Sequence, residues 1–273
     1  MFCRTALRPL FSLKLIGEIK MQSLSYLQIR TALQELKIPR GIPLLVHSSL
    51  RALKAPVEGG AQTMVDALLE TLGSGGTLVV PTLSLSSVEE HHPVFDALHT
   101  PSDCGAFTQF VRSLPGAFRS CHVVSSAAAI GAHAKELTAG HLDTPCGADS
   151  PYARIIEAGG AVLFLGTDLG CNTLFHAAEE AEARPYLRYA KIRDAKITDC
   201  AGNHFIHTFR RYNCYQTGVN RYLEKMEPIF SEMGVLHRAG LGAATLTLVN
   251  AEQDFSLCRQ TLREREEYLL QRN

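Results

Sequence analysis

Apolar and polar positions along this chain alternate between helical and extended patterns. Apolar side chains keep helical spacing through residues 26–36, and a Pro-Arg-Gly stop then precedes an apolar run at 44–46. Helical spacing returns at 64–72, and a glycine-rich turn leads into a second apolar run, TLVVPT, at 77–82. Two continuous apolar runs joined by one helix predict a βαβ unit with parallel, buried strands.

The same alternation continues toward the C-terminus. A helical pattern surrounds residues 107–114, a third apolar run, AVLFLG, occupies 161–166, and TLTLVN at 245–250 precedes a charged helix that begins at Ala251. This order predicts an α/β fold in one domain, with a central mixed, partly parallel sheet and helices on both of its faces.

Two segments fall outside that alternation. The stretch between Ser84 and Pro101 is long for a connection, which predicts a lid or an insertion on the substrate side. Residues 1–20 carry four basic side chains and a single acid, Glu18. We interpret them as an extension outside the core rather than a transit peptide, and their apolar runs are too short to span a bilayer. The domain is therefore predicted over residues 21–273.

Composition narrows the classes of partner. Lys plus Arg and Asp plus Glu both number 27, so no overall field favours nucleic acid or an acidic membrane surface. The eight cysteines lie singly, without Cys-x-x-Cys spacing, which favours a reducing, cytoplasmic location and gives no zinc motif. Three histidines share one loop without metal-ligand spacing and are interpreted as solvated: His91, His92 and His99. No metal, nucleic-acid or membrane partner is expected.

Polar side chains follow each predicted core strand. Ser48 and Ser49 follow the first strand, Thr82 the second and Asp168 the third. Because ligand crevices in open α/β sheets form beyond the carboxyl ends of the strands, these side chains are predicted to share one sheet edge. Capping and turn formation are an alternative role for the two serines.

The segment GTDLGCNTLFHAAEEAE at 166–182 contains the clearest candidate for a catalytic base. Asn172 or Thr173 offers a cap to a helix on which His176 lies three and four residues before Glu179 and Glu180. A carboxylate bound to one imidazole nitrogen fixes the tautomer and leaves the other nitrogen as a base. A solvated helix face with no catalytic role is the alternative.

Five stretches in this order resemble the aminoglycoside 3-N-acetyltransferase family of antibiotic acetyltransferases. They are LLVHSSLRAL, VEGGAQTMVDALLETLGSGGTLVVPT, the segment from FDALHTPSDCGAFTQF to HAKELTAGH, SPYARIIEAGGAVLFLG and NTLFHAAE. The resemblance implies a three-layer α/β/α sandwich, acetyl-CoA as the acetyl donor, and a small-molecule amine of an aminoglycoside or related amino sugar as the acceptor.

The resemblance also implies roles for individual residues. His176 is the expected general base, and Glu179 belongs to the same active-site helix. Residues expected on the cofactor side are His47, Ser48, Ser49, Leu50, Thr82, Arg119, Ser120, His122 and Ser126. Our candidates for binding the acceptor are Asp168, Asn172, Thr173 and Glu180. A valine follows His122 where family members usually have proline.

General chemistry agrees with this scheme. An acceptor amine is mostly ammonium at neutral pH, so a base must take its proton before the nitrogen attacks a thioester. Backbone N–H groups near Ser48 and Ser49 are candidate donors to the resulting oxyanion. Direct transfer in a ternary complex then requires no metal and no covalent acetyl-enzyme. Either a monomer or a homodimer is compatible with the sequence.

Two other hypotheses and one question of charge stay open. Cys171, five residues before His176, defines a Cys-His covalent acyltransferase or hydrolase. A noncatalytic relative that binds coenzyme A or an amine is the second. Residues 210–233 carry four basic side chains against three glutamates, which favours an acceptor less basic than a polycationic aminoglycoside.

Overall fold

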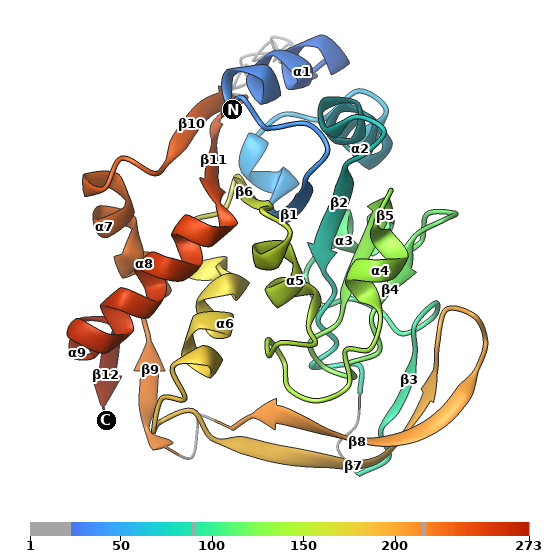
Figure 1. The fold of residues 1–273 in the computed structure, drawn as a ribbon. Helices are drawn as coiled ribbons and strands as arrows, with labels where there is room; N and C mark the ends of the chain where they lie inside the picture. Colours follow the sequence, from blue (N-terminus) through green and yellow to red (C-terminus); the bar gives the residue numbers. More distant parts are fainter. Residues whose placement is uncertain (1–22, 89–90, 214–216, 273) are drawn as a thin grey trace, which may run out of the picture.

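A seven-stranded mixed sheet forms the centre of the protein in the computed structural model, which describes residues 23–88, 91–213 and 217–272 (Figure 1). The predicted extension at residues 1–20 lies outside the described residues. The strand order is β10-β11-β6-β1-β2-β5-β4. The bounds are β1 (Pro43–Ser48), β2 (Thr77–Pro81), β4 (Phe118–Arg119), β5 (Ala127–Gly131), β6 (Ala161–Leu165), β10 (His237–Leu241) and β11 (Ala244–Asn250).

The three central strands run parallel and the flanking strands run antiparallel. β1 pairs in parallel with both β2 and β6, and β11 and β5 pair antiparallel on either side of them. The predicted parallel pair at 44–46 and 77–82 and the mixed sheet are thus confirmed. All residues of β2 and β6 are buried, as continuous apolar runs require when both sheet faces are covered.

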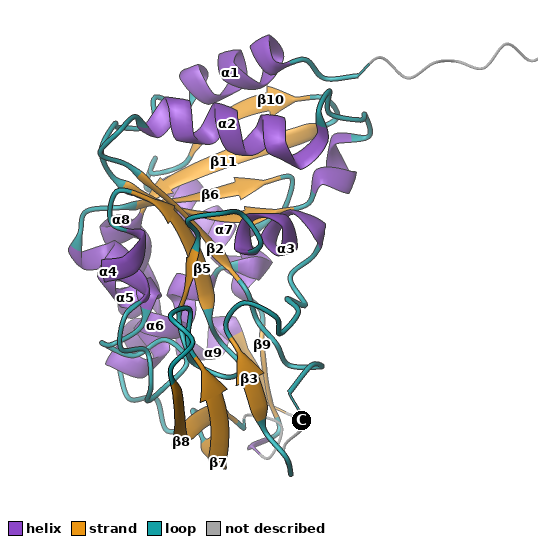
Figure 2. Cartoon of the chain, turned by 90° about the vertical axis from the view of Figure 1, so that its right-hand side faces the viewer, coloured by secondary structure: helices purple, strands orange, loops and turns teal. Residues whose placement is uncertain are grey.

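Helices cover both faces of this sheet (Figure 2). One apolar cluster includes residues of α1 (Tyr26–Glu35), α2 (Gly60–Leu72) and α3 (Ala106–Arg112). The cluster on the other face includes residues of α4 (Ala134–Thr138), α5 (Pro151–Glu157), α6 (Thr173–Ala181), α7 (Met226–Glu232), α8 (Ala251–Glu264) and α9 (Glu266–Leu269). The predicted three-layer α/β/α sandwich is confirmed.

A second, smaller sheet lies below the carboxyl ends of the central strands in Figure 1. It joins β3 (Val94–Asp96), β7 (Tyr189–Thr198) and β8 (His204–Tyr212) in the order β3-β7-β8. β3 lies inside the segment 84–101 that was expected to form a lid, and its central residue, Phe95, is fully buried. The part around β3 is therefore packed into a sheet rather than standing free.

The C-terminal strand of the described residues pairs with a strand near residue 220. β12 (Leu270–Arg272) pairs antiparallel with β9 (Val219–Arg221), with Leu270 opposite Arg221. Within the described ranges, no helix combines the length and apolar character needed to cross a bilayer.

Candidate active site

A cavity of about 450 Å³ opens where β1 and β6 end and α6 begins. We call it the strand-end cavity. It is lined by His47, Ser48, Pro81, Leu83, Leu85, Cys104, Thr108, Ser125, Cys146, Tyr152, Thr167, Gly170, Cys171, Thr173, His176, Tyr212 and Arg221. The sheet-edge rule applied to the sequence thus locates a real concavity. Leu85 comes from the segment that was expected to form a lid.

His176 and Glu179 form a close pair on α6. The distance between His176 Nδ1 and Glu179 Oε2 is 2.6 Å; the histidine side chain is 22% exposed and the glutamate is fully buried. Burial by itself raises the pKa of Glu179, but the contacts with His176 and Arg221 outweigh it and hold that pKa below its ordinary value. An ionised carboxylate accepts the proton of Nδ1, so Nε2 is the ring nitrogen left to act as a base.

Two further side chains hold the Glu179 carboxylate. Tyr186 donates its hydroxyl hydrogen to Oε1 at 2.6 Å, and Arg221 donates from Nη1 to Oε2 at 2.9 Å. Arg221 Nη1 also lies 3.4 Å from His176 Nδ1, but this longer contact joins two donors once Nδ1 is protonated. Neither Tyr186 nor Arg221 was a candidate from the sequence, because Tyr186 lies in a turn after α6 and Arg221 on β9, and only the fold brings both side chains to Glu179.

The first two residues of the HSSL turn, His47 and Ser48, line the cavity. His47 is buried against Phe164, and its Nε2 lies 3.3 Å from the Thr173 hydroxyl. Burial, and then the nearby His176, lowers the pKa of His47 to about 3, so this imidazole stays neutral.

Ser49 and Leu50 turn the chain away from β1. The Ser49 N–H donates to the Leu165 carbonyl at 2.8 Å, and Leu50 begins the 3-10 helix Leu50–Leu53. Of the backbone N–H groups near Ser48 and Ser49 that were candidate oxyanion donors, the Ser49 N–H is therefore already bonded to β6.

Arg119, Thr82 and Ser126 form one buried polar network behind the cavity. Arg119 Nε lies 3.1 Å from the Thr82 hydroxyl and 3.0 Å from the Ser126 hydroxyl. The guanidinium carbon of Arg119 lies 4.8 Å from the centre of the Phe95 ring. Burial, and then Arg112, lowers the pKa of Arg119 to about 9, which keeps it charged at neutral pH. These groups satisfy one another, and they are not part of the cavity wall.

Ser120 and His122 are buried in a neighbouring cluster. The Ser120 hydroxyl lies 3.1 Å from His141 Nδ1, and His122 stacks on His141 at 4.8 Å. Ser125 N–H donates to His122 Nδ1, so His122 Nε2 carries the proton that is donated to the Arg210 carbonyl. The structure therefore gives both side chains protein partners and places neither in the cavity wall.

The four acceptor candidates occupy different positions around α6. Asn172 caps the helix through its carbonyl oxygen and donates to Asp254 at 2.8 Å, so its amide is fully used. Thr173 lines the cavity. Glu180 accepts from the Tyr212 hydroxyl at 2.5 Å and lies behind it. Asp168 is exposed beside Gly170, at the rim.

Cys171 lines the cavity in the 3-10 helix Leu169–Cys171. Burial, and then Asp168, raises the pKa of its thiol. A nucleophilic cysteine needs the opposite shift, because the thiolate is the reactive form.

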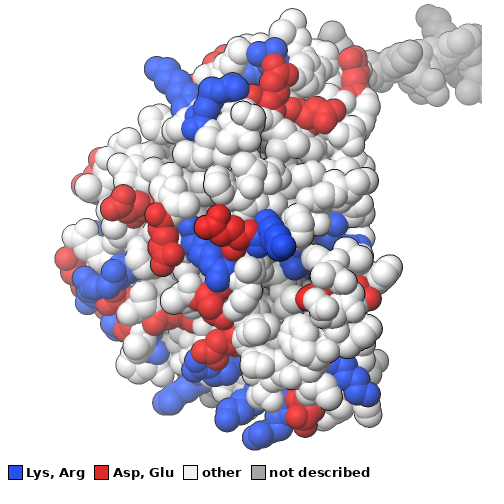
Figure 3. Space-filling model, turned by 45° about the vertical axis from the view of Figure 1, so that its right-hand side comes forward, with Lys and Arg blue, Asp and Glu red and all other residues white. Residues whose placement is uncertain are grey.

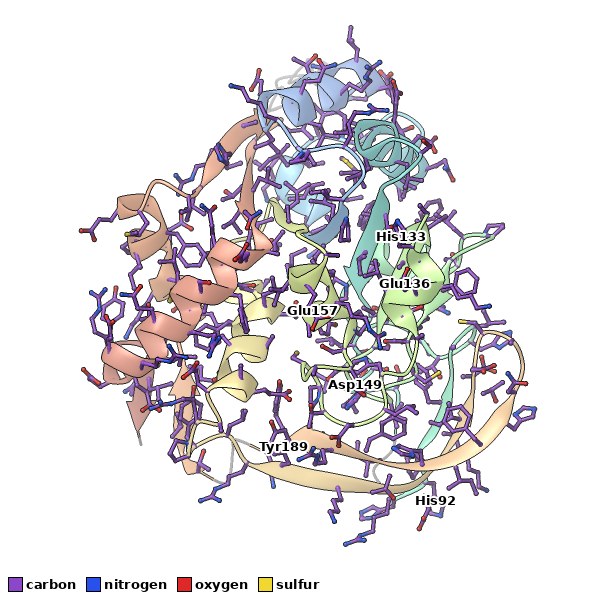
Figure 4. All side chains as sticks on the ribbon, viewed as in Figure 1. His92, His133, Glu136, Asp149, Glu157 and Tyr189 are labelled. Carbon is purple, nitrogen blue, oxygen red and sulfur yellow. The ribbon has the colours of Figure 1, made fainter. Side chains whose placement is uncertain are left out.

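His92 lies away from α6, next to β3 of the small sheet. Figure 4 shows His92 at the β3 end of the small sheet, whereas Tyr189 lies at the other end of β7. His99 Nδ1 contacts Asp96 Oδ2 at 3.0 Å. Across residues 23–88, 91–213 and 217–272, no group of three or more His, Cys, Asp or Glu side chains is placed to hold a metal ion.

Known proteins are similar to this chain in both sequence and fold. The family model described as aminoglycoside 3-N-acetyltransferase matches residues 45–263. Aminoglycoside N(3)-acetyltransferase VII of Streptomyces paromomycinus is 34% identical over 177 residues, which is 58% of this chain and 61% of that protein. The match thus spans about three fifths of that relative. Aminoglycoside N(3)-acetyltransferase IX of Micromonospora chalcea is 30% identical over 256 residues, 84% of this chain and 90% of its own.

Two solved structures bear on the ligands of such folds. AAC-IIIb in a binary complex with CoASH superposes with a TM-score of 0.77 at 26% identity, over 89% of this chain and 98% of that one. AAC-VIa bound to sisomicin gives a TM-score of 0.78 at 26% identity, over 89% and 99%. With residues 45–263 matched by the family model and most of its length matched by relatives, the chain belongs to the aminoglycoside 3-N-acetyltransferase family.

Proposed function

We propose that this protein is an acetyl-CoA-dependent N-acetyltransferase that acts on an amine of an aminoglycoside or related amino sugar, with His176 as the general base. The observation that carries the proposal is the 2.6 Å contact between the buried Glu179 carboxylate and Nδ1 of His176, whose side chain lines the strand-end cavity. Relatives with this name and a CoASH-bound structure of similar fold support the donor.

The donor's thioester fits the strand-end cavity by its lining. Pro81, Leu83 and Leu85 give an apolar wall, and Ser48 and Thr167 present buried hydroxyls without a protein partner among the described residues. A thioester with a slender amide-bearing arm needs this combination of apolar contact and few polar groups. When bound, acetyl-CoA supplies the activated acetyl group.

The residues of the chain then divide the work. Glu179 fixes the ring of His176 and stabilises the imidazolium that forms when Nε2 takes the acceptor proton. Tyr186 and Arg221 hold that carboxylate in place. His47 stays neutral beside the base, so it adds no competing positive charge. No covalent enzyme intermediate is needed.

The charge around the cavity bears on the acceptor. Of the lining residues in the described part of the chain, none is Asp or Glu, and Arg221 is a permanent cation. Asp168 and Glu224 lie near Gly170 at the rim, where they can receive an ammonium distant from the reacting amine. Acidic and basic side chains are interspersed on the face shown in Figure 3. We therefore propose that an acceptor with few positive charges is preferred.

The structure favours direct transfer over the covalent alternative through Cys171. The thiol has a raised pKa, whereas His176 is already oriented by Glu179. We place the activity in the cytoplasm, because the six described cysteines are free.

A thiol-release assay with acetyl-CoA tests the proposal across aminoglycosides, amino sugars and simple monoamines. Cys171→Ala is expected to keep most of the wild-type rate, and His176→Ala to lose it. His133→Ala is the matched control, since His133 and Glu136 repeat the same three-residue spacing on the exposed surface, 3.3 Å apart (Figure 4). Loss of activity in Cys171→Ala alone would establish the covalent mechanism. Coenzyme A binding without thiol release from any amine would show a noncatalytic relative.

A further inference from the structure

Two hydroxyl groups in the wall of the strand-end cavity lack a hydrogen-bond partner among the described residues. They are Ser48 Oγ and Thr167 Oγ1, and both oxygens are shielded from solvent. Buried polar atoms in native proteins are almost always paired, so each exception needs an explanation. A ligand group received at this point explains both.

The fold brings these hydroxyls to the same edge of the sheet. Ser48 is the last residue of β1 and pairs with Leu165, the last residue of β6, and Thr167 follows two residues later. Gly166 lies between them with a φ of 67°, and a Cβ there would lie 2.9 Å from the Ser49 carbonyl oxygen. Only glycine permits this turn and this close approach, which hold the two strand ends together.

Four other hydroxyls of the cavity wall are already engaged within the protein. Thr173 contacts His47, Tyr212 donates to Glu180, and protein carbonyls accept from Thr108 and Tyr152. The backbone N–H of Ser49, another candidate donor to the ligand, is also engaged, since it donates to the Leu165 carbonyl. Ser48 and Thr167 therefore keep donor capacity for a ligand oxygen.

We propose that the hydroxyls of Ser48 and Thr167 donate hydrogen bonds to the carbonyl oxygen of the acetyl thioester and stabilise its negative charge during transfer. This inference rests on the proposed function. A nitrogen lone pair forms the new N–C bond while the C=O π pair moves onto the oxygen. That pair then restores the carbonyl as the C–S bond breaks. The amine proton passes to His176 Nε2 and from there to the departing thiolate, which leaves as the thiol.

Such donors act mainly on the transition state. The oxygen carries its full negative charge only after attack, so the hydrogen bonds strengthen at that point more than in the bound ground state. Loss of one donor of this kind typically lowers kcat by roughly 10²-fold to 10³-fold. The Michaelis constant for acetyl-CoA should change little.

Two variants and two readouts test the inference. Ser48→Ala and Thr167→Val are expected to lower kcat about 10²-fold, with the KM for acetyl-CoA changed less than about threefold. The Tm of each ligand-free variant should equal or exceed that of the wild type, because the lost hydroxyl has no protein partner to leave behind. Thr167→Ser, which keeps the hydroxyl, should restore most of kcat.

Thr77→Val is the matched control on the same sheet. Thr77 is fully buried at the start of β2, and its hydroxyl accepts the His133 N–H at 2.9 Å. This variant should lose Tm and keep the kcat of the folded protein, the reverse of the other two.

Three results would overturn the inference while leaving the proposed function intact. They are an unchanged kcat in both variants, a rise in KM alone, and a loss of Tm that accounts for the loss of activity. A wild type that releases no thiol with any amine would contradict the proposed function and remove the basis of this inference as well.

Discussion

Arg221, which lines the strand-end cavity, and the buried Glu179 form a 2.9 Å ion pair that joins β9 to α6. The carboxylate is fully buried, and the guanidinium side chain is 19% exposed. Arg221 thus neutralises the carboxylate nearest to the base, so an approaching cation meets a guanidinium there instead of an available anion. Acceptor selectivity should depend on this one residue.

Arg221→Gln is expected to shift that selectivity toward polycations. Removing the guanidinium exposes the charge of Glu179, so kcat/KM for sisomicin relative to a monoamine should rise about tenfold. Both substrates are measured in the thiol-release assay at one ionic strength. Arg238→Gln is the control, because Arg238 pairs with Glu227 on the exposed surface. An equal change of the ratio in both variants would contradict a local effect.

Glu179→Gln should cost roughly 10²-fold to 10³-fold in kcat/KM. An amide carries no charge to stabilise an imidazolium at His176, and it leaves Arg221 without its counter-charge. The rate is measured with saturating acetyl-CoA at several acceptor concentrations. Glu136→Gln removes an exposed carboxylate at the same spacing from a histidine, and should be neutral. Equal rates in the two variants would refute the role of Glu179.

Tyr186→Phe tests positioning separately from charge. The Tyr186 hydroxyl donates to Glu179 Oε1 at 2.6 Å, and its loss leaves one buried carboxylate oxygen unpaired. We expect kcat to fall about tenfold with little change in KM, and the free energy of unfolding to fall by about 1–3 kcal/mol. Thermal or urea unfolding beside steady-state kinetics separates the two effects. A drop in stability with unchanged kcat would assign Tyr186 a purely structural role.

Buried histidines should make the fold sensitive to acid. Burial lowers the pKa of His47 and of His141 from 6.5 to about 3 and holds that of His122 well below 6.5. Each is neutral when folded and protonated when unfolded between these limits, so stability present above pH 6.5 is lost as pH falls toward 3. Burial raises the pKa of Asp254 to about 6. Below pH 6 the folded protein keeps a proton on this carboxyl that the unfolded chain releases, so Asp254 changes the stability with pH in the opposite direction to the histidines.

At pH 5 these four groups together should take up about two protons on unfolding, three at the histidines less one released at Asp254. Two protons correspond to about 2.7 kcal/mol of unfolding free energy per pH unit. Denaturant unfolding at intervals from pH 7 to pH 4 measures this slope. His141→Gln should reduce it by about one proton. A slope of zero over this range would contradict neutral, buried imidazoles.

Local pattern was enough to predict the centre of the fold. β1, β2 and β6 are continuous apolar runs that need two covered faces, and the Asn172 cap begins the helix that carries His176. Their carboxyl ends meet because the strands are parallel neighbours, a consequence of topology alone. The sequence therefore located the cavity through Ser48 and His176.

The small sheet was missed because its pattern is broken. β7 carries a bulge between Ile192 and Ala195, with Asp194 at a φ of 52°, which shifts the two-residue period midway along the strand. Four of its ten side chains are exposed and charged, so no continuous apolar run marks this strand.

The partners of Glu179 could not be read from the sequence either. Arg221 reaches it from 42 residues away, on a strand held by β12 at the other end of the chain. Motif matching likewise grouped Arg119 and Ser126 with the cofactor side, but only the packing shows that they bond to each other beneath the cavity wall. Residue type is local information, whereas burial and pairing are set by the whole fold.

Chemical rescue of His176→Ala measures the central claim most directly. The alanine leaves room beside Glu179 for an added imidazole to take the acceptor proton. The account predicts that His176→Ala releases thiol at least 10²-fold more slowly than the wild type, and that imidazole restores the rate in proportion to its unprotonated concentration. A variant that keeps the wild-type rate without imidazole would contradict proton transfer to position 176.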